Sequence, residues 1–205
     1  MTKQRIYLTL ILLLLLLAIC SGCINCQMSE TQQTNVTKIK EQIVEQNPKN
    51  DSIVSYEEYE IYSYLLKREG SAEIKVFIAN KTTDGITRDY SNFDEVFDAV
   101  KGFTRFPIPN EVLNDYRLKN QESDEIFDKF NLKSEYKVGN GKDFSREQYG
   151  VIFGFSRVGF NEKKDLGLVF YEYYSGPKTA GGVFAILEKK NGNWQVVSEY
   201  TPWVS

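Results

Sequence analysis

Short apolar runs separated by turn residues fill the last third of the chain, and this pattern predicts a series of strands. In the first run, Val151, Phe153 and Phe155 recur at every second position. Period-two spacing places such side chains on one face of a strand. The predicted strands are residues 151–160, 166–174, 183–187 and 194–200.

The links between these strands are short and rich in turn residues. Asn191-Gly192 separates the last two runs, and Asn-Gly favours a two-residue hairpin, in which both positions need positive φ. Pro177 ends the second run, since proline lacks the N–H that a strand ladder uses. We therefore expect an antiparallel meander with one face buried.

A helix is predicted earlier in the chain, from Tyr56 to Arg68. Ser55 followed by Glu58 forms a capping box, in which each side chain binds the other residue's backbone N–H. Apolar residues at helical spacing indicate a core helix packed on the sheet, and a tyrosine-lined ligand site is the alternative. The apolar face consists of Tyr56, Tyr59, Ile61, Tyr62, Leu65 and Leu66.

The region between this helix and the strands predicts elements of both kinds. Two further helices are expected, one capped by Ser91 and ending at Lys101, the other capped by Asn110 and ending near Lys119. The remaining expectations are a strand at 72–79, one or two helical turns within 121–130, and an exposed loop at 136–147.

Together these elements predict an α+β fold, with N-terminal helices packed on a C-terminal antiparallel meander sheet of four or five strands. The order of helices followed by a meander is also similar to the cone-shaped fold of nuclear-transport-factor-like proteins. That similarity concerns the pattern alone, and a fold does not by itself identify a function.

The first residues have the pattern of a secretory signal, because Lys3 and Arg5 precede a short apolar run. The run is shorter than the ~20 residues of a typical membrane-spanning helix. Ser21-Gly22 before Cys23 resembles the lipobox of lipoproteins, in which the chain is cut before the cysteine and lipid is attached to it. We expect residues 1–22 to be a signal peptide, and an uncleaved signal anchor is the alternative.

The expected organisation places a folded domain on the outer face of the cell membrane. Residues 23–51 are polar and are expected to form a tether, and residues 52–205 a single α+β domain. Both the lipid anchor and the signal anchor leave this domain outside the cytoplasm. The expected partners are the membrane itself and a protein or another component of the cell envelope.

Composition excludes several kinds of chemistry. The chain has no histidine, which excludes Ser-His-Asp and Cys-His catalysis and metal sites built on imidazole. Its cysteines, Cys20, Cys23 and Cys26, all precede the predicted domain, so no disulfide or thiolate metal site is expected there. A net charge of −3 without a basic run argues against nucleic-acid binding. No cofactor or metal is expected.

Four carboxylates are the candidates for general acid–base catalysis. A hydrolase of the glycosidase type, acting on an envelope polymer, needs two carboxyl groups about 5–10 Å apart across a cleft. Adjacent carboxylates on a helix point in different directions, and a chain rich in acids contains such pairs by chance. No catalytic residue is therefore assigned. The four candidates are Glu57, Glu58, Glu60 and Glu172.

Arg157, Asn161 and Trp203 are the candidate ligand-binding residues. An arginine within an apolar strand faces solvent or pairs with a carboxylate, and the alternative is that its guanidinium binds an anionic ligand. Trp194 and Trp203 are expected to pack in the core, and an exposed aromatic platform for a sugar or peptide is the alternative. An acidic face that is expected to be solvated consists of Asp124, Glu125 and Asp128.

The C-terminal strands also carry a distinctive set of motifs: FSRVGFN, LGLVFY, GGVFAILEKKNGNWQVV and a terminal WVS. This pattern resembles an uncharacterised family of small secreted or lipid-anchored prokaryotic proteins. Members of that family often carry two cysteines in the glycine-rich link, whereas residues 175–182 of this chain contain none. The resemblance implies a fold and a location but no activity. We expect a binding or interaction domain, and the alternatives are a carboxylate-dependent hydrolase and a small-ligand carrier.

Overall fold

The computed structural model of the chain describes residues 53–69, 74–84, 86 and 90–205. The predictions for the signal segment, the lipidated Cys23 and the tether lie outside these residues. Among the residues that are described, no helix is both long enough and apolar enough to cross a membrane.

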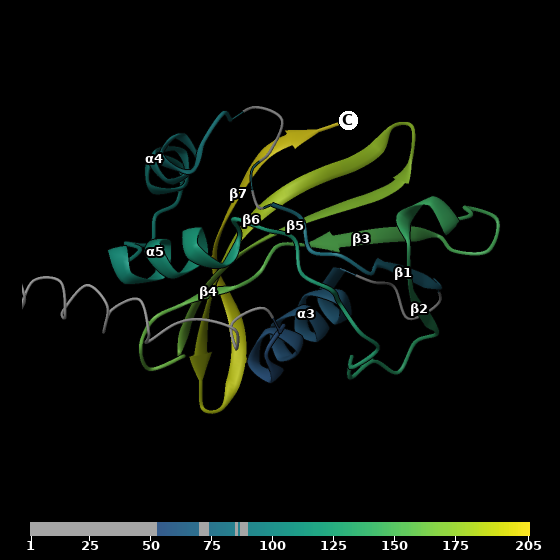
Figure 1. Cartoon of the computed structure of the whole chain (residues 1–205), viewed down its shortest axis with the longest axis horizontal. Helices are drawn as coiled ribbons and strands as arrows, with labels where there is room; N and C mark the ends of the chain where they lie inside the picture. Colours follow the sequence, from purple (N-terminus) through teal and green to yellow (C-terminus); the bar gives the residue numbers. More distant parts are fainter. Residues whose placement is uncertain (1–52, 70–73, 85, 87–89) are drawn as a thin grey trace, which may run out of the picture. The chain divides into compact units, whose positions relative to one another are not determined.

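A mixed sheet of seven strands forms the centre of the described part of the chain (Figure 1). The strand order is β2-β1-β3-β5-β6-β7, and β4 pairs with β5 off this path. The strands are β1 Val76–Ala79, β2 Tyr136–Gly139, β3 Val151–Phe155, β4 Gly159–Phe160, β5 Leu166–Gly176, β6 Thr179–Lys190 and β7 Asn193–Val204.

The neighbours β3, β5, β6 and β7 pair antiparallel, which confirms the predicted meander. β1 instead runs parallel to both β2 and β3, so the expectation of a purely antiparallel sheet is wrong. Parallel strands need a long crossover connection, and the chain between β1 and β2 supplies one that contains two helices. The exposed loop expected at 136–147 is also wrong in part, because it begins with β2.

The strands β5 and β6 are buried on both faces, so the expectation of a single buried face is wrong. In β5, Leu168 and Phe170 pack into one cluster of apolar side chains, whereas Val169 and Tyr171 pack into another. Successive side chains of a strand point to opposite faces, so the two clusters lie on opposite sides of the sheet.

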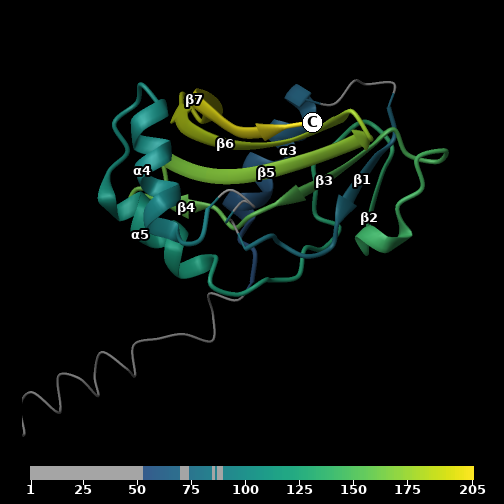
Figure 2. The same cartoon turned by 90° about the horizontal axis from the view of Figure 1, so that it is seen from above.

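The α-helices of the described residues lie on these two faces (Figure 2). α3, Tyr56–Glu69, contributes Ile61 and Tyr62 to the cluster that contains Tyr171. α4, Phe93–Phe103, and α5, Asn110–Lys119, lie together and contribute to the opposite cluster. These helices and the mixed sheet confirm the α+β class.

The start of α3 follows the predicted capping box. The Ser55 backbone N–H donates to Glu58 Oε2 at 2.7 Å, and the Glu58 N–H donates to Ser55 Oγ at 3.4 Å. Both bonds satisfy N–H groups that have no partner within the first turn of a helix.

Two other predicted caps are wrong. The N-cap of α4 is Asn92 rather than Ser91, and its side chain accepts a backbone N–H of the first turn. α5 begins at Asn110 itself, with Pro109 at the N-cap position and no side-chain cap bond. Residues 121–130 form no helix.

The strand predicted at 151–160 is interrupted. β3 and β4 both pair with β5, and Ser156, Arg157 and Val158 lie between them. Ser156 stays close to β5, because its N–H donates to Phe170 O at 2.8 Å and its Oγ accepts the Phe170 N–H at 2.9 Å. The interruption therefore leaves the backbone of Arg157 and Val158 available for bonds outside the sheet.

The contact between β4 and α5 generates a prediction about stability. A Cβ at Gly159 would lie 2.5 Å from both Tyr116 N and Val112 O of α5. Gly159→Ala is expected to lower the free energy of unfolding by about 1–3 kcal/mol, because backbone atoms must move to admit the methyl group. Urea denaturation measures the change.

Gly102→Ala in α4 is the matched control. Nothing lies within 4 Å of the Cβ position of Gly102, and alanine favours a helix over glycine by up to about 1 kcal/mol. This variant is expected to be as stable as the parent or slightly more stable. A similar loss of stability in both variants would contradict the close packing of β4 on α5.

Candidate ligand-binding groove

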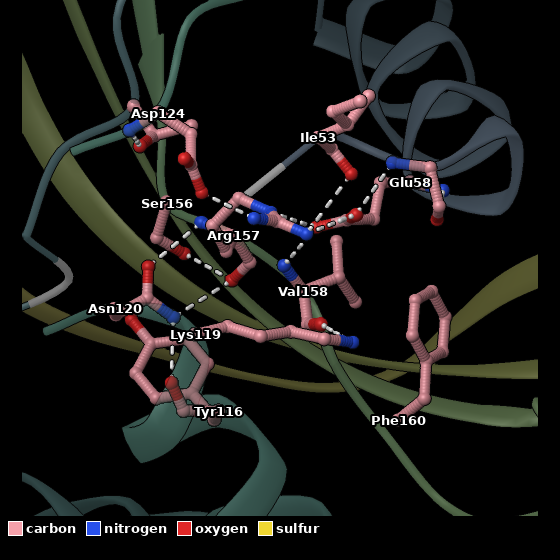
Figure 3. Close-up of polar contacts among 12 residues, drawn as sticks. Ile53, Glu58, Tyr116, Lys119, Asn120, Asp124, Ser156, Arg157, Val158 and Phe160 are labelled. Carbon is pink, nitrogen blue, oxygen red and sulfur yellow. Dashed lines mark hydrogen bonds and ion pairs between the residues drawn. The ribbon is translucent and has the colours of Figure 1, made fainter. Parts of the chain in front are cut away.

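Arg157 lies inside the fold, bound by two carboxylates (Figure 3). Its Nε donates to Glu58 Oε1 at 2.8 Å, and its Nη2 donates to Glu58 Oε2 at 3.0 Å. Its Nη1 forms a further ion pair with Asp124. Since Arg157 is 2 % exposed, the ion-pair interpretation is confirmed, and Asp124 belongs to this pair rather than to a solvated face.

The backbone around Arg157 is organised by the same side chains. Glu58 Oε1 also accepts the Val158 N–H at 2.9 Å. The Asn120 side chain accepts the Arg157 N–H at 2.8 Å and donates to the Arg157 C=O at 3.1 Å. Burial lowers the pKa of Arg157, but the carboxylates of Glu58 and Asp124 more than offset this and hold it above its usual value. A ligand-binding role for Arg157 stays a prediction.

Asn161 shapes the turn between β4 and β5. Its Oδ1 accepts the N–H groups of Asp165 and Leu166, each at 3.0 Å. Lys164 in this turn has a φ of 53°, in the left-handed region. Asn161 and Arg157 also line a surface hollow of about 480 Å³, and a contact of Asn161 with a ligand there stays a prediction.

Trp203 lies on β7, paired with Gly182 of β6. A Cβ at Gly182 would lie 2.4 Å from Trp203 Nε1, so only glycine leaves room for the indole. Glu172 pairs with Gly182 from the other side, and it lines a hollow of about 200 Å³ together with Trp203. Trp203 is half-buried, whereas Trp194 is buried as expected for core packing.

Most of the candidate catalytic carboxylates bind cations. These ion pairs give the acids a role in joining elements of the fold. Within the described ranges, no group of three His, Cys, Asp or Glu side chains is arranged to hold a metal ion. The pairs are Glu57 with Lys164 at 3.1 Å, Glu58 with Arg157 at 2.8 Å and Glu60 with Lys189 at 2.9 Å.

A groove of about 390 Å³ runs beside α3, and we call it the α3 groove. Its walls are one face of α3, residues 129–131, and the turn between β6 and β7. The α3 residues recur at helical spacing and therefore share one face of the helix. The lining consists of Tyr56, Tyr59, Glu60, Ser63, Tyr64, Lys67, Lys129, Asn131, Gly192, Asn193 and Trp194.

Three hydroxyl groups of α3 fasten neighbouring segments to the helix. Each hydroxyl oxygen accepts a backbone N–H, two from the segment after α5 and one from β7. The α3 groove is therefore held in shape by bonds within the protein. The bonds are Phe127 N–H to Tyr59 Oη at 2.8 Å, Asn131 N–H to Ser63 Oγ at 3.0 Å, and Val196 N–H to Tyr64 Oη at 3.4 Å.

Each of these hydroxyls also carries a proton that it can donate, because a hydroxyl combines one O–H donor with two acceptor positions. Within the part of the chain that the structure describes, the O–H groups of Tyr59, Ser63 and Tyr64 have no acceptor. Burial raises the pKa of Tyr59, so its hydroxyl stays neutral and able to donate. The lining of the α3 groove thus contains three O–H donors, of which Tyr64 is half-buried and Tyr59 and Ser63 are each 3 % exposed.

Positive charge adds to these donors. Lys67 and Lys129 line the α3 groove, and neither forms an ion pair with any other described residue. Glu60, the acid of the lining, is bound to Lys189 at 2.9 Å. The α3 groove therefore carries two ammonium groups and one neutralised carboxylate.

Trp194 contributes an unusual buried group to the same lining. It is 5 % exposed, and its indole N–H has no acceptor among the described residues. Its ring centroid lies 5.9 Å from that of Phe160 and 5.4 Å from the Lys189 ammonium. A buried donor without an acceptor costs about 1–3 kcal/mol, and such groups are rare in folded proteins.

The sequence pointed to the α3 groove only through one alternative, which was that the helix predicted at 56–68 carries a tyrosine-lined ligand site. The apolar-face prediction places Tyr56 in the core, but its side chain is 77 % exposed, so that part is wrong. Tyr56 is the first residue of α3, whereas Tyr59 and Tyr62 lie within the helix and are buried as predicted. Lys129 has no local signal, because its segment lacks a regular period.

Comparison with known proteins finds no family model, no curated protein and no solved structure that matches the chain. The resemblance to small secreted or lipid-anchored proteins therefore stays a prediction. The functional interpretation depends on the geometry and chemistry of the surfaces described above.

The buried ion pair generates a prediction that uses two adjacent residues. Glu58→Gln is expected to lower the free energy of unfolding by about 3–5 kcal/mol, because it leaves the Arg157 charge buried with half of its pairing lost. Glutamine retains the shape and the capping ability of the side chain, so the change tests the charge. Urea denaturation at neutral pH measures the loss.

Glu57→Gln is the control for this substitution. The Glu57–Lys164 pair is substantially exposed, and such pairs contribute less than about 1 kcal/mol. A loss in Glu58→Gln as small as that in Glu57→Gln would contradict a structural role for the buried pair.

Proposed function

We propose that this chain is a lipid-anchored binding domain on the extracytoplasmic face of the cell membrane. The proposal takes residues 1–22 as a signal peptide, Cys23 as the lipidated residue and residues 23–51 as a tether. The α3 groove is the binding site, and the ligand is a component of the cell envelope.

The observation that carries this proposal is the unused hydrogen-bonding capacity of the α3 groove. Three O–H donors and two ammonium groups line a preformed surface beside an exposed tyrosine ring. Donors that the protein itself leaves without acceptors are available to a ligand.

Binding accounts for the α3 groove better than hydrolysis does. Glu60 is the acid of the lining, and its carboxylate is held by Lys189. Acid–base hydrolysis needs two carboxyl groups with different protonation states, one on each side of the bond that is cut. The lining supplies donors and cations instead.

The finer interpretations of the fold belong to the same proposal. They are the packing of N-terminal helices on a cone-shaped sheet like that of nuclear-transport-factor-like proteins, and membership of the uncharacterised family with the SRVGFN motif. Two observations support the packing of helices on such a sheet. They are the antiparallel run β3-β5-β6-β7 and the contribution of α3 to one of the two apolar clusters of the sheet.

The anchor is tested by the intact mass of protein extracted from membranes. The expected mass is that of residues 23–205 plus lipid, because lipoprotein processing cuts before the cysteine that is modified. Cys23→Ser is expected to abolish the lipid mass, whereas Cys26→Ser, the control, is expected to keep it. A mass for the whole chain, with Met1 present and no lipid, would show a signal anchor instead.

Binding at the α3 groove is tested by the fluorescence of Trp194. The chain has two tryptophans, so Trp203→Phe leaves Trp194 as a single reporter in the groove lining. Soluble fragments of the cell envelope are expected to change its emission with a saturable dependence, and the fragments are expected to remain uncut.

Tyr56→Ala in that background is expected to weaken binding about tenfold, because a lost aromatic contact costs about 1–1.5 kcal/mol. Tyr174→Ala is the control, since Tyr174 is also exposed but lies outside the α3 groove. Equal weakening by both variants, or cleavage of the fragments, would overturn the proposed function.

A further inference from the structure

We infer that the α3 groove binds a carboxylated polysaccharide, in which sugar rings carry carboxylate groups. This inference rests on the proposed function and identifies the class of its ligand.

The balance of donors and acceptors in the α3 groove points to a ligand rich in acceptors. Tyr59, Ser63 and Tyr64 each offer an O–H, and each of their oxygens already accepts a backbone N–H. The Trp194 N–H also has no acceptor in the described residues, but its nitrogen is buried and is not counted among the donors that face the groove. The carboxylate of Glu60, the strongest acceptor of the lining, is engaged by Lys189. Ring, glycosidic and carboxylate oxygens of a sugar acid only accept hydrogen bonds, whereas its hydroxyl groups both accept and donate, so its acceptors outnumber its donors.

Charge indicates that some of these acceptors are anionic. Lys67 and Lys129 lie on different walls of the α3 groove, one on α3 and one on the segment after α5. A carboxylate between them forms charge-assisted bonds, which are about twice as strong as neutral ones. Neither ammonium has an ion-pair partner among the described residues that would have to be displaced.

The shape and the aromatic content of the α3 groove suit sugar rings. From Tyr56 to Lys67 the helix rises by about 16 Å at about 1.5 Å per residue, so the lining accommodates a short oligosaccharide. The Tyr56 ring is 77 % exposed at one end of this lining. An exposed aromatic ring offers an apolar face beside polar groups, which matches a sugar ring with C–H groups on its face and oxygens at its edge.

Two other classes of polymer fit less well. Every non-proline peptide residue carries an N–H donor for each C=O acceptor, so a bound peptide needs protein acceptors, and the side chains of this lining offer chiefly the amide oxygens of Asn131 and Asn193. Nucleic acids bind mainly through many phosphate contacts with cations, whereas the chain has a net charge of −3 and two ammonium groups in the α3 groove.

The test uses the full-length, detergent-solubilised protein with Trp203→Phe, so that Trp194 reports on the α3 groove. Three defined probes are titrated: an oligogalacturonide, the same oligosaccharide with its carboxylates converted to methyl esters, and an oligoglutamate of the same charge. The first is expected to bind at least about tenfold more tightly than either of the others. Its affinity is expected to fall as salt is raised, because the cations are exposed.

A matched pair of double variants locates the charge contribution. Lys67→Gln with Lys129→Gln is expected to weaken oligogalacturonide binding about tenfold, whereas Lys133→Gln with Lys178→Gln removes the same charge outside the α3 groove and is expected to change it less than twofold. All of these lysines are exposed, so the folds of the two variants are comparable.

Each contrary result has a distinct meaning. Equal binding of the methyl ester would overturn the inference, because carboxylate charge would not be required. Equal binding of the oligoglutamate would also overturn it, because a sugar would not be required. Both results would leave the proposed binding function intact. No response to any probe, with a Trp194 response to envelope fragments, would also overturn the inference alone. No response to either probes or fragments would overturn the proposed function as well.

Discussion

The buried ion pair between Glu58 and Arg157 is the interaction on which the rest of the structure depends. It joins the start of α3 to the interruption between β3 and β4, and Asp124 adds the segment after α5. Removing two charges from water costs several kcal/mol for each, and only close geometry with further hydrogen bonds offsets that cost. Here each Glu58 oxygen accepts one hydrogen bond from Arg157 and one from a backbone N–H. The backbone donor is Val158 for Oε1 and Ser55 for Oε2.

The same pair fixes the rotation of α3 and thereby shapes the α3 groove. Successive residues of a helix are about 100° apart around its axis. With Glu58 directed at Arg157, the hydroxyls of Tyr59 and Ser63 meet the N–H groups of the segment after α5. A rotation of α3 by one residue would break the ion pair and both of these bonds together. The arrangement of the groove is therefore coupled to a charged interaction in the interior.

Several features that depend on a few neighbouring residues were predictable from sequence, although the caps expected at Ser91 and Asn110 were wrong. Features that depend on distant residues were not predictable. The capping box at Ser55 is present, and Asn191 and Gly192 have the positive φ values of 51° and 79° that the predicted hairpin needs. By contrast, Arg157 lies 99 residues from Glu58, so no local pattern could pair them. The parallel pairing of β1 likewise depends on a crossover connection that leaves no periodic signal.

The chemistry of the α3 groove follows from how the chain uses its polar groups. The chain has no histidine, and its cysteines all lie outside the described residues, so hydroxyl, amide, indole, ammonium, guanidinium and carboxylate groups are what the domain offers. Most of the candidate carboxylates bind cations that join elements of the fold, whereas the hydroxyls and two of the lysines line the groove with donor capacity to spare. Under the proposed function, a surface whose acids maintain the structure and whose remaining polar groups are mainly donors suits an acceptor-rich ligand. This separation of acids from donors is the physical reason to interpret the groove as a binding site.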